Sequence, residues 1–412
     1  MSVVVVGGGL AGARTVEHLR AGGYDERVVL LAQETELPYE RPPLSKGYLQ
    51  GTDPRERARV HDEGWYADHD VDLRLGVTAA QLDLGAQDVL DADGTRHGFE
   101  HLVLATGSEP RRLTVPGADL DGVLALRTLD DSDRLRAAID RATRVVVVGG
   151  GWIGLEVAAA ARTAGRHVAL VVRGALPLDR VLGPQTAPLF ADLHREHGVD
   201  LRLRADVAEL VPDGGGSRVG GVLLADGTLL EADLVVAAVG AAPRVGLAER
   251  AGLTVQDGVV VDQHLRASAP HVLAVGDVAR AHHPFYGTHL RVEHWDNAQH
   301  QPATAAATIL GRDEPYTRLP YFYTDQYDLG MEYVGWAGHD GRGYDEVVVR
   351  GDAAARELVV FWLHGRRVVA GMNVNVWDVN DDIRALVTSR AVVDPRALAD
   401  AQVPLSEVAR RA

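Results

Sequence analysis

The sequence predicts an α/β fold with a duplicated βαβ unit, one copy inserted into the other, and a separate α+β domain at the C-terminal end. The motif VVVVGGG occurs at residues 3–9 and again at residues 145–151, each time before an alanine-rich helical stretch. A second apolar strand follows each copy, over residues 28–31 and residues 168–172. Duplicated βαβ units predict parallel sheets with helices on both faces.

Three further apolar segments predict where these domains end. Residues 101–106 (HLVLAT) and 233–239 (DLVVAAV) each precede a glycine, and residues 271–275 precede Gly276 and Asp277. Because the third segment lies beyond the second copy, we expect a discontinuous first domain. The predicted boundaries are residues 1–112 and 243–319 for the first domain, and residues 113–242 for the inserted one.

The pattern of residues changes from Pro320 onward. Alternating aromatic and apolar residues stand between Gly/Asp turns, which predicts antiparallel strands. A short helix is expected over residues 381–389. Residues 320–412 are therefore predicted to form a C-terminal α+β interface domain.

Composition and charge exclude several classes of protein. A formal charge of −16 argues against nucleic-acid binding, which needs a basic face. The sequence contains no cysteine, so disulfides, thiolate metal sites and redox disulfides are excluded. The chain starts with an apolar strand instead of a signal-peptide pattern. The longest nearly uncharged run, residues 145–161, is short for a membrane span and carries Glu156. We expect a cytoplasmic protein that binds no membrane, as a monomer or weak dimer.

Both VVVVGGG copies extend into the pattern G-x-G-x-x-G, whose glycines are Gly7, Gly9 and Gly12, and then Gly149, Gly151 and Gly154. The first glycine permits a tight turn, the second lets a pyrophosphate approach the backbone, and the third lets helix and strand pack closely. The helix N-terminus then faces the anion. Two such sites suggest a resident flavin and an exchangeable nicotinamide nucleotide, with a hydride passing between them.

Seven motifs in order give the chain a family resemblance. They are PYERPPLSKGYL (38–49), ATG (105–107), RTLDD (127–131), GGGWIGLE (149–156), AVGDVA (274–279), EHWDNA (293–298) and YFYTDQYDLG (321–330). Together they resemble the flavoprotein ferredoxin reductases of bacterial oxygenase systems, over essentially the whole chain. The resemblance implies two Rossmann-like domains on a glutathione-reductase-like plan, with FAD on the discontinuous domain and NADH or NADPH on the inserted one.

The resemblance also implies an FAD site. Its residues are Gly7, Gly9, Leu10, Ala11, Gly12, Gln33, Glu34, Arg41, Lys46, Ala79, Ala105, Thr106, Gly107, Arg127, Gly276, Asp277, Glu293, His294 and Trp295. Gln33, where the family usually has aspartate, or Glu34 would meet the adenosine ribose, and the backbone at Ala79 the adenine. Arg41 and Arg127, the latter on a linker strand, would serve the phosphates. Ribitol hydroxyls would partner Asp277.

Three residues are candidates for the chemistry itself. Lys46, fixed by neighbouring prolines, would place a cation near flavin N5 and stabilise the negative reduced flavin. Trp295, expected at a helix start after a loop over residues 282–291, would contact the flavin on the side of the electron acceptor. Glu156 follows the second cradle, where a bound pyrophosphate should repel it, and pairing with Lys46 would resolve that conflict.

The implied NAD(P)-binding residues are Gly149, Gly151, Trp152, Ile153, Gly154, Glu156, Val172, Arg173 and Gly240. In NADH-using members a glutamate ends the second strand of this domain. Here Val172 takes that place and Arg173 follows. A carboxylate binds the ribose diol and repels a 2′-phosphate, whereas a nearby arginine does the opposite. The departure makes NADPH use plausible and weakens the expectation of NADH, so both nucleotides stay open.

The absence of cysteine also bears on the electron acceptor, because the disulfide route of glutathione-type reductases is closed. The resemblance implies an acidic 2Fe–2S ferredoxin that docks transiently and feeds a cytochrome or Rieske-type oxygenase. Candidate docking cations are Arg291 and the Arg55, Arg57 and Arg59 group. The alternatives are a rubredoxin reductase, an NAD(P)H oxidase, or a non-catalytic flavoprotein of the apoptosis-inducing-factor type. Five histidines within residues 282–300 are not expected to bind metal.

Overall fold

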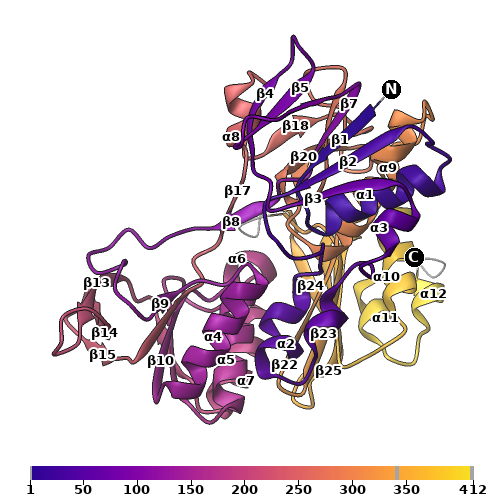
Figure 1. Ribbon diagram of the computed structural model, residues 1–412. Coiled ribbons are helices and arrows are strands. Elements are labelled where there is room, and N and C mark those ends of the chain that lie inside the picture. Colours follow the sequence, from indigo (N-terminus) through magenta and orange to yellow (C-terminus); the bar gives the residue numbers. More distant parts are fainter. Residues whose placement is uncertain (1, 339–342, 409–412) are drawn as a thin grey trace. The chain divides into compact units, whose positions relative to one another are not determined.

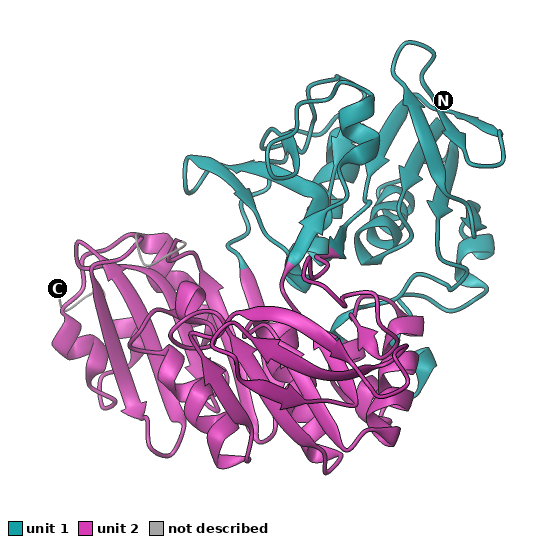
Figure 2. Cartoon of the chain, turned by 90° about the vertical axis from the view of Figure 1, so that its left-hand side faces the viewer, with its two compact units in different colours: residues 1–42, 54–109, 241–320 teal, residues 43–53, 110–240, 321–412 magenta. Residues whose placement is uncertain are grey.

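The structure is a computed structural model that describes residues 2–338 and 343–408 (Figure 1). The chain forms two compact units (Figure 2). The first comprises residues 1–42, 54–109 and 241–320, and the second comprises residues 43–53, 110–240 and 321–412. The chain leaves the first unit at β8 (Ser108–Pro110) and returns to it at β17 (Ala241–Pro243). Each unit is described below by itself.

The first unit is built on a five-stranded parallel sheet of order β19-β7-β1-β2-β3. Its strands are β1 (Ser2–Val6), β2 (Arg27–Ala32), β3 (Val71–Leu75), β7 (His101–Leu104) and β19 (Val272–Ala274). The valines of β1 are buried, as expected for a parallel strand that is covered on both faces. This sheet confirms the predicted strands over residues 28–31, 101–106 and 271–275.

Helices and two small sheets complete the first unit. Helix α1 (Leu10–Ala21) packs against α9 (Trp295–Ile309). The other helical elements of this unit are short: α3 (Trp65–Asp68), α8 (Gly246–Arg250) and the 3₁₀ turns η2 (Arg55–Ala58) and η3 (Gly276–Val278). One small sheet joins β4 (Ala79–Asp83), β5 (Asp88–Asp91) and β6 (Arg96–Gly98), and the other joins β18 (Val259–Val261), β20 (Ala279–His283) and β21 (Thr288–Arg291).

The predicted loop over residues 282–291 is wrong, because most of this segment is the hairpin of β20 and β21. His282 pairs with His289 in its register, and their rings lie 5.3 Å apart. Such cross-strand ring pairs stabilise a hairpin, whereas the sequence pattern drew attention only to the number of histidines. The helix predicted to begin at Trp295 is confirmed.

The second unit repeats the same sheet order. Its parallel sheet runs β12-β11-β10-β16-β9, with β9 (Val123–Leu124), β10 (Arg144–Val148), β11 (His167–Val172), β12 (Asp200–Leu203) and β16 (Leu234–Ala237). In both sheets the VVVV strand lies third and continues through the glycine turn into a helix, here α5 (Trp152–Thr163). The other helices are α4 (Leu129–Arg141), α6 (Asp179–Leu182) and α7 (Ala187–Glu196), and β13 (Val207–Pro212), β14 (Val219–Leu224) and β15 (Leu229–Glu231) form a meander.

The C-terminal part of the second unit contains the predicted antiparallel strands, in the order β22-β23-β26-β25-β24. They are β22 (Tyr321–Gln326), β23 (Leu329–Gly335), β24 (Glu346–Asp352), β25 (Glu357–His364) and β26 (Arg367–Val374), followed by α10 (Asn380–Ser389), α11 (Pro395–Ala399) and α12 (Leu405–Val408). Helix α10 covers β23 and β26, and β22 packs against α5. This last contact brings the C-terminal sheet to the second cradle.

A short segment from early in the chain also belongs to the second unit. Residues 43–53 contain most of η1 (Pro42–Ser45) and all of α2 (Gly47–Gln50), and α2 packs against α4. Ser132 donates its hydroxyl hydrogen to the Leu44 carbonyl at 2.9 Å, and Tyr48 donates to Asp133 at 2.6 Å. The segment that carries Lys46 is therefore held beside the inserted sheet, although the sequence places it among the FAD-binding residues.

Candidate active site

The first cradle lies between β1 and α1, and its glycines differ in the space around them. A Cβ atom on Gly7, whose φ is +124°, would lie 2.1 Å from the Ala105 oxygen, and one on Gly12 would lie 1.9 Å from the Gly7 oxygen. A Cβ atom on Gly9 would meet nothing within 4 Å. The first and third glycines are therefore required by packing, whereas the second faces open space that a pyrophosphate can fill.

The second cradle, between β10 and α5, has the same geometry. A Cβ atom on Gly149 would lie 2.2 Å from the Ala238 oxygen, and one on Gly154 would lie 2.1 Å from the Gly149 oxygen. Again the middle glycine, Gly151, has nothing within 4 Å. Neither α1 nor α5 has a side-chain cap or an acidic residue in its first turn. Both helix N-termini are thus suited to bind an anion, and both cradles fit a dinucleotide.

Several predicted FAD residues meet around the first cradle. Ala105 abuts Gly7, and the Cβ of Ala11 would lie 3.0 Å from a Cβ on Gly276, so Leu10–Gly12, Ala105–Gly107 and Gly276 converge. Asp277 accepts a hydrogen bond of 2.7 Å from Ser108. Ser108 is a site neighbour that the sequence analysis missed, since nothing in its local motif marks it.

The predicted ribose contacts, Gln33 and Glu34, lie at the end of β2. Gln33 accepts a hydrogen bond of 3.2 Å from Arg244, another residue that the sequence did not single out. Glu34 accepts a hydrogen bond from Tyr39 and forms a 3.1 Å ion pair with Arg41. Burial acts to lower the pKa of Arg41, but Tyr39, Glu34 and Asp277 outweigh it and the pKa is raised. Arg41 is therefore a fixed cation.

The remaining predicted FAD residues occupy varied positions. Ala79 begins β4. Arg127 precedes the capping box of α4 and donates its backbone N–H to Asp131 at 3.1 Å. Its predicted place on a strand is wrong, because β9 ends at Leu124 and the cap sets the backbone after it. Arg127 also belongs to the second unit.

Trp295 is the first residue of α9, preceded by Glu293 and by His294 as the N-cap. It is half-buried and interacts with Glu40. Burial raises the pKa of Glu40, and the interaction with Trp295 works in the opposite direction. The indole is thus fixed by a carboxylate on a separate segment of the first unit.

The structure brings Lys46 and Glu156 together, as the sequence analysis predicted. Lys46 Nζ donates to Glu156 Oε1 at 2.7 Å, and the Lys46 ammonium lies 5.4 Å from the centre of the Tyr323 ring. Glu156 is only 5% exposed, and its carboxylate also accepts hydrogen bonds of 2.5 Å from Ser45 and from Thr324. Three donors therefore satisfy this buried charge.

This arrangement explains how a glutamate can follow a phosphate cradle. Glu156 is the fifth residue of α5, and its carboxylate is bonded to the 43–53 segment and to β22. Burial raises the pKa of the neighbouring Asp325. The charge of Lys46 opposes this rise, and the charge of Glu156 adds to it. Ser45, Thr324 and Asp325 were missed from the sequence, because each lies far from residue 156 along the chain.

The other NAD(P)-site predictions lie around α5 and at the ends of β11 and β16. Trp152 packs against Phe190 and Phe322, at ring distances of 5.5 and 4.8 Å, whereas the neighbouring Ile153 is exposed. Val172 is buried, and its Cγ2 would lie 2.8 Å from a Cβ atom on Gly150. Gly240 follows β16 with a φ of +98°.

Arg173 extends from the end of β11 into solvent. Its side chain is 88% exposed, and Nε donates to Asp206 Oδ1 at 2.6 Å. Asp206 follows β12, the strand next to β11, and the sequence analysis did not consider it. An exposed pair of this kind is readily broken, so Arg173 remains available to an anionic ligand.

Two of the four candidate docking cations, Arg291 and Arg55, are paired with acids. Arg291 is 13% exposed and bonds to both Asp257 and Glu293. Arg55 pairs with Glu36 at 2.9 Å. The charges of Arg291 and Arg55 are therefore compensated by these acids, and the predicted docking face stays a prediction.

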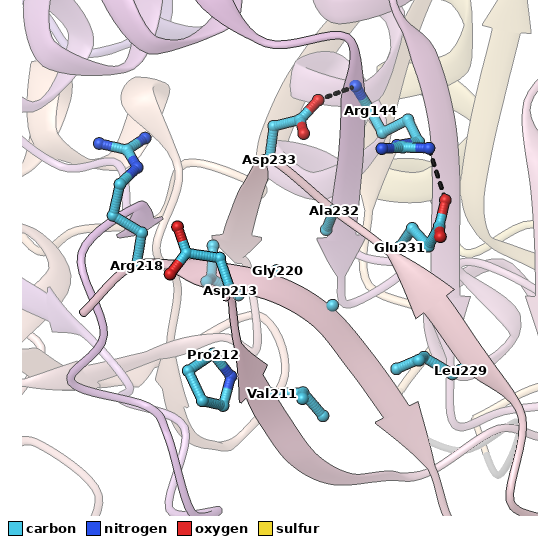
Figure 3. A pocket seen from close by; sticks show the side chains of 12 residues that line it. Arg144, Val211, Pro212, Asp213, Arg218, Gly220, Leu229, Glu231, Ala232 and Asp233 are labelled. Carbon is cyan, nitrogen blue, oxygen red and sulfur yellow. Dashed lines mark hydrogen bonds and ion pairs between the residues drawn. The ribbon is translucent and has the colours of Figure 1, made fainter. Parts of the chain in front are cut away.

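Two further features lie apart from the cradles. A pocket of about 390 Å³ lies on the β13–β15 meander, bordered by Arg144, Asp213, Arg218 and Glu231, and contains none of the predicted site residues (Figure 3). Among residues 2–338 and 343–408, no group of three or more His, Asp or Glu side chains is arranged to hold a metal ion. Within the same residues, every helix is too short or too polar to span a membrane.

Comparison with known protein families decides the assignment. Residues 1–302 match the family model described as pyridine nucleotide-disulphide oxidoreductase, and residues 321–409 match the model described as reductase C-terminal. The chain belongs to the pyridine nucleotide-disulphide oxidoreductase family. It is therefore an oxidoreductase that uses FAD and a pyridine nucleotide. Unlike the members that give the family its name, it has no cysteine with which to form a disulfide.

Relatives of known function support the same assignment. The chain is 38% identical to putidaredoxin reductase CamA of Pseudomonas putida, over 99% of this chain and 96% of that one. It is 40% identical to the anthranilate 1,2-dioxygenase system ferredoxin–NAD(+) reductase component of Burkholderia cepacia, over 98% of each chain. A rubredoxin–NAD(+) reductase of Pseudomonas putida is 34% identical over 91% of this chain and 96% of its own.

A solved structure matches the whole fold. The reductase in a covalent putidaredoxin reductase–putidaredoxin complex superposes with a TM-score of 0.95 at 38% identity, covering 100% of this chain and 98% of that one. The predicted fold class is thereby confirmed.

Proposed function

We propose that this protein is an NAD(P)H-dependent FAD flavoprotein that passes electrons to a 2Fe–2S ferredoxin serving an oxygenase. The observation that carries the proposal is the presence of two dinucleotide cradles in a chain without cysteine. A chain that cannot form a disulfide must release electrons from the flavin itself. The relatives named for ferredoxin reduction support the choice of acceptor.

Each cradle receives one dinucleotide in this proposal. Gly7–Gly12, Ala105–Gly107 and Gly276–Asp277 would hold FAD, and Gly149–Gly154 would hold the nicotinamide nucleotide. When bound, FAD accepts a hydride from NAD(P)H and releases its two electrons singly, as a one-electron acceptor requires. One NAD(P)H therefore reduces two ferredoxins and releases one proton.

The residues of the chain would orient and stabilise this exchange. Lys46 supplies a cation that can balance the charge gained on reduction, and its bond to Glu156 fixes the ammonium. Glu156 is satisfied by its own donors and so presents little repulsion to the pyrophosphate. We also propose three functional domains. The FAD domain comprises residues 1–112 and 243–319, the NAD(P)H domain residues 113–242, and the interface domain residues 320–412.

We further propose that Arg173 permits NADPH to bind. Asp206 competes with a 2′-phosphate for the Arg173 guanidinium. NADPH would bind when its 2′-phosphate replaces Asp206 at Arg173, and NADH would bind through the rest of the site, so both nucleotides are accepted. The ion pair is exposed enough for this exchange.

The test is electron delivery under anaerobic conditions. The protein should bind FAD, NADH or NADPH should bleach the flavin, and cytochrome c reduction should depend on an added 2Fe–2S ferredoxin. Cytochrome c reduction that depends on rubredoxin instead would favour the second candidate, which rests on the rubredoxin reductase relative. Absence of flavin bleaching by either nucleotide would overturn the proposal.

A further inference from the structure

Glu156 lies at one end of a buried chain of hydrogen bonds. Behind its carboxylate lie Thr324 and Gln326 on β22 and then His194 on α7. Gln326 Nε2 donates to Thr324 Oγ1 at 3.2 Å, and His194 Nε2 lies 2.9 Å from Gln326 Oε1. All three side chains are buried, at 0–1% exposure. We call these three residues the polar chain.

The chemistry of each group fixes the direction of these bonds. Burial lowers the pKa of His194 to about 4, so the imidazole is neutral at physiological pH. A neutral imidazole carries one N–H, and a proton on Nε2 lets it donate to Gln326 Oε1. The Gln326 amide is then held with its NH₂ group toward Thr324 Oγ1.

The same constraint passes to Glu156. Because Thr324 Oγ1 accepts from Gln326, its one hydrogen is directed to Glu156 Oε1, at 2.5 Å. Lys46 Nζ donates to the same oxygen, and Ser45 donates to Oε2. The polar chain therefore supplies one of the three hydrogen bonds that orient the carboxylate, and the carboxylate in turn holds the Lys46 ammonium.

We propose that Thr324 and Gln326 are positioning residues for hydride transfer, acting only through Glu156. This inference rests on the proposed function. It assigns β22 of the C-terminal sheet a role in the nicotinamide site in addition to any role in docking. Without the Thr324 hydroxyl the carboxylate retains Lys46 and Ser45 but can rotate, so that hydride transfer slows while nucleotide binding changes little.

The experiment compares Thr324→Val with Thr324→Ser in the FAD-loaded protein. The valine variant should reduce the rate constant of anaerobic flavin reduction about tenfold, as expected for loss of a hydrogen bond to a charged group. The serine variant retains the hydroxyl and should stay within about twofold of the wild type. Affinity for NAD⁺, measured by calorimetry, should change less than about threefold in both.

Two further variants separate positioning from general packing. Gln326→Glu offers Thr324 a competing acceptor, so it should slow reduction as Thr324→Val does. Thr186→Val is the matched control, because Thr186 is also buried in the same unit, at 5% exposure, and its hydroxyl makes no hydrogen bond to the part of the chain that the structure describes. It should leave the rate unchanged.

A double substitution decides whether Thr324 acts through Glu156. In a Glu156→Gln background, Thr324→Val should cause no further loss. An equal loss in both backgrounds, or failure of serine to restore the rate, would overturn the proposal and leave Thr324 a packing residue. If the wild type itself is not reduced by NADH or NADPH, the proposed function fails instead, so the two failures are distinguishable.

Discussion

The two cradles have the same backbone and differ at the fifth residue of the helix. In the first cradle this residue is Arg14, which bonds to Glu17 at 2.6 Å and to Gln299 at 2.9 Å near the surface. In the second it is Glu156, which is buried and held by Ser45, Lys46 and Thr324. The shared glycines provide a phosphate site in both cradles. The fifth residue distinguishes them, because only in the second cradle is it a buried carboxylate bonded to Lys46.

The largest expected effect comes from substituting the glycines that both cradles require for packing. A Cβ atom on Gly12 or Gly154 would lie within 2.1 Å of a backbone oxygen, so Gly12→Ala and Gly154→Ala should each lower the free energy of unfolding by on the order of 3 kcal/mol. Urea unfolding would measure this loss. The control is Gly98→Ala, where a Cβ atom meets nothing within 4 Å and a change within about 1 kcal/mol is expected. Equal effects at all three positions would contradict the close packing.

A comparable effect should come from the polar chain, which lies behind the second cradle. His194 has a pKa of about 4 when folded and about 6.5 when unfolded. The unfolded state therefore binds the proton first, and stability is lost as the pH falls from about 6.5 to about 4, by roughly 3 kcal/mol in total. Below pH 4 this loss stops growing.

The measurement is urea unfolding of the wild type and of His194→Gln across that pH range. The glutamine variant removes the titrating group, so its stability should fall less steeply between these pH values. Parallel curves for the two proteins would show that His194 does not titrate as its burial implies.

The third prediction compares the fifth residues directly. Glu156→Gln should slow anaerobic flavin reduction by about 10- to 100-fold, because Lys46 loses its charged partner. Arg14→Gln, at the equivalent position, should stay within about threefold, because its partners lie outside the nicotinamide cradle. Rapid-mixing absorbance at saturating nucleotide measures both. Similar losses in the two variants would remove the distinction between the cradles.

The smallest expected effect concerns the choice of nucleotide at the second cradle. Asp206→Asn should free Arg173 and lower the Michaelis constant for NADPH by about three- to fivefold, with little change for NADH, as expected for an exposed pair. Arg173→Ala should raise the constant for NADPH more than that for NADH. Steady-state kinetics with each nucleotide would measure both constants. Parallel shifts for the two nucleotides would show that Arg173 does not read the 2′-phosphate.

The sequence predicted the parts of the molecule that depend on local patterns. A few neighbouring residues determine the conformation of the G-x-G-x-x-G turns, the β-branched strands and the alternating C-terminal strands. The structure confirms these elements. The Lys46–Glu156 pair was also predicted, because a buried carboxylate beside a phosphate cradle needs a cation. The family resemblance supplied the candidate for that cation.

Contacts between distant segments were not predictable in the same way. Ser45 and Thr324 reach Glu156 across 111 and 168 residues of sequence, and a lone serine or threonine has no pattern that marks it as a carboxylate partner. The β20–β21 hairpin, predicted as a loop, was missed because the pairing of His282 with His289 is not visible in the local pattern. Asp206 was missed because the ends of β11 and β12 become neighbours only when the sheet forms.

The most direct test of the central claim changes the middle glycine of each cradle, since each faces open space. Gly9→Val should yield folded protein without bound FAD, seen as loss of flavin absorbance per chain. Gly151→Val should retain the flavin absorbance but show no bleaching when mixed anaerobically with NADH or NADPH. The opposite pattern, or loss of FAD from both variants, would contradict the assignment of one cradle to the flavin and the other to the hydride donor.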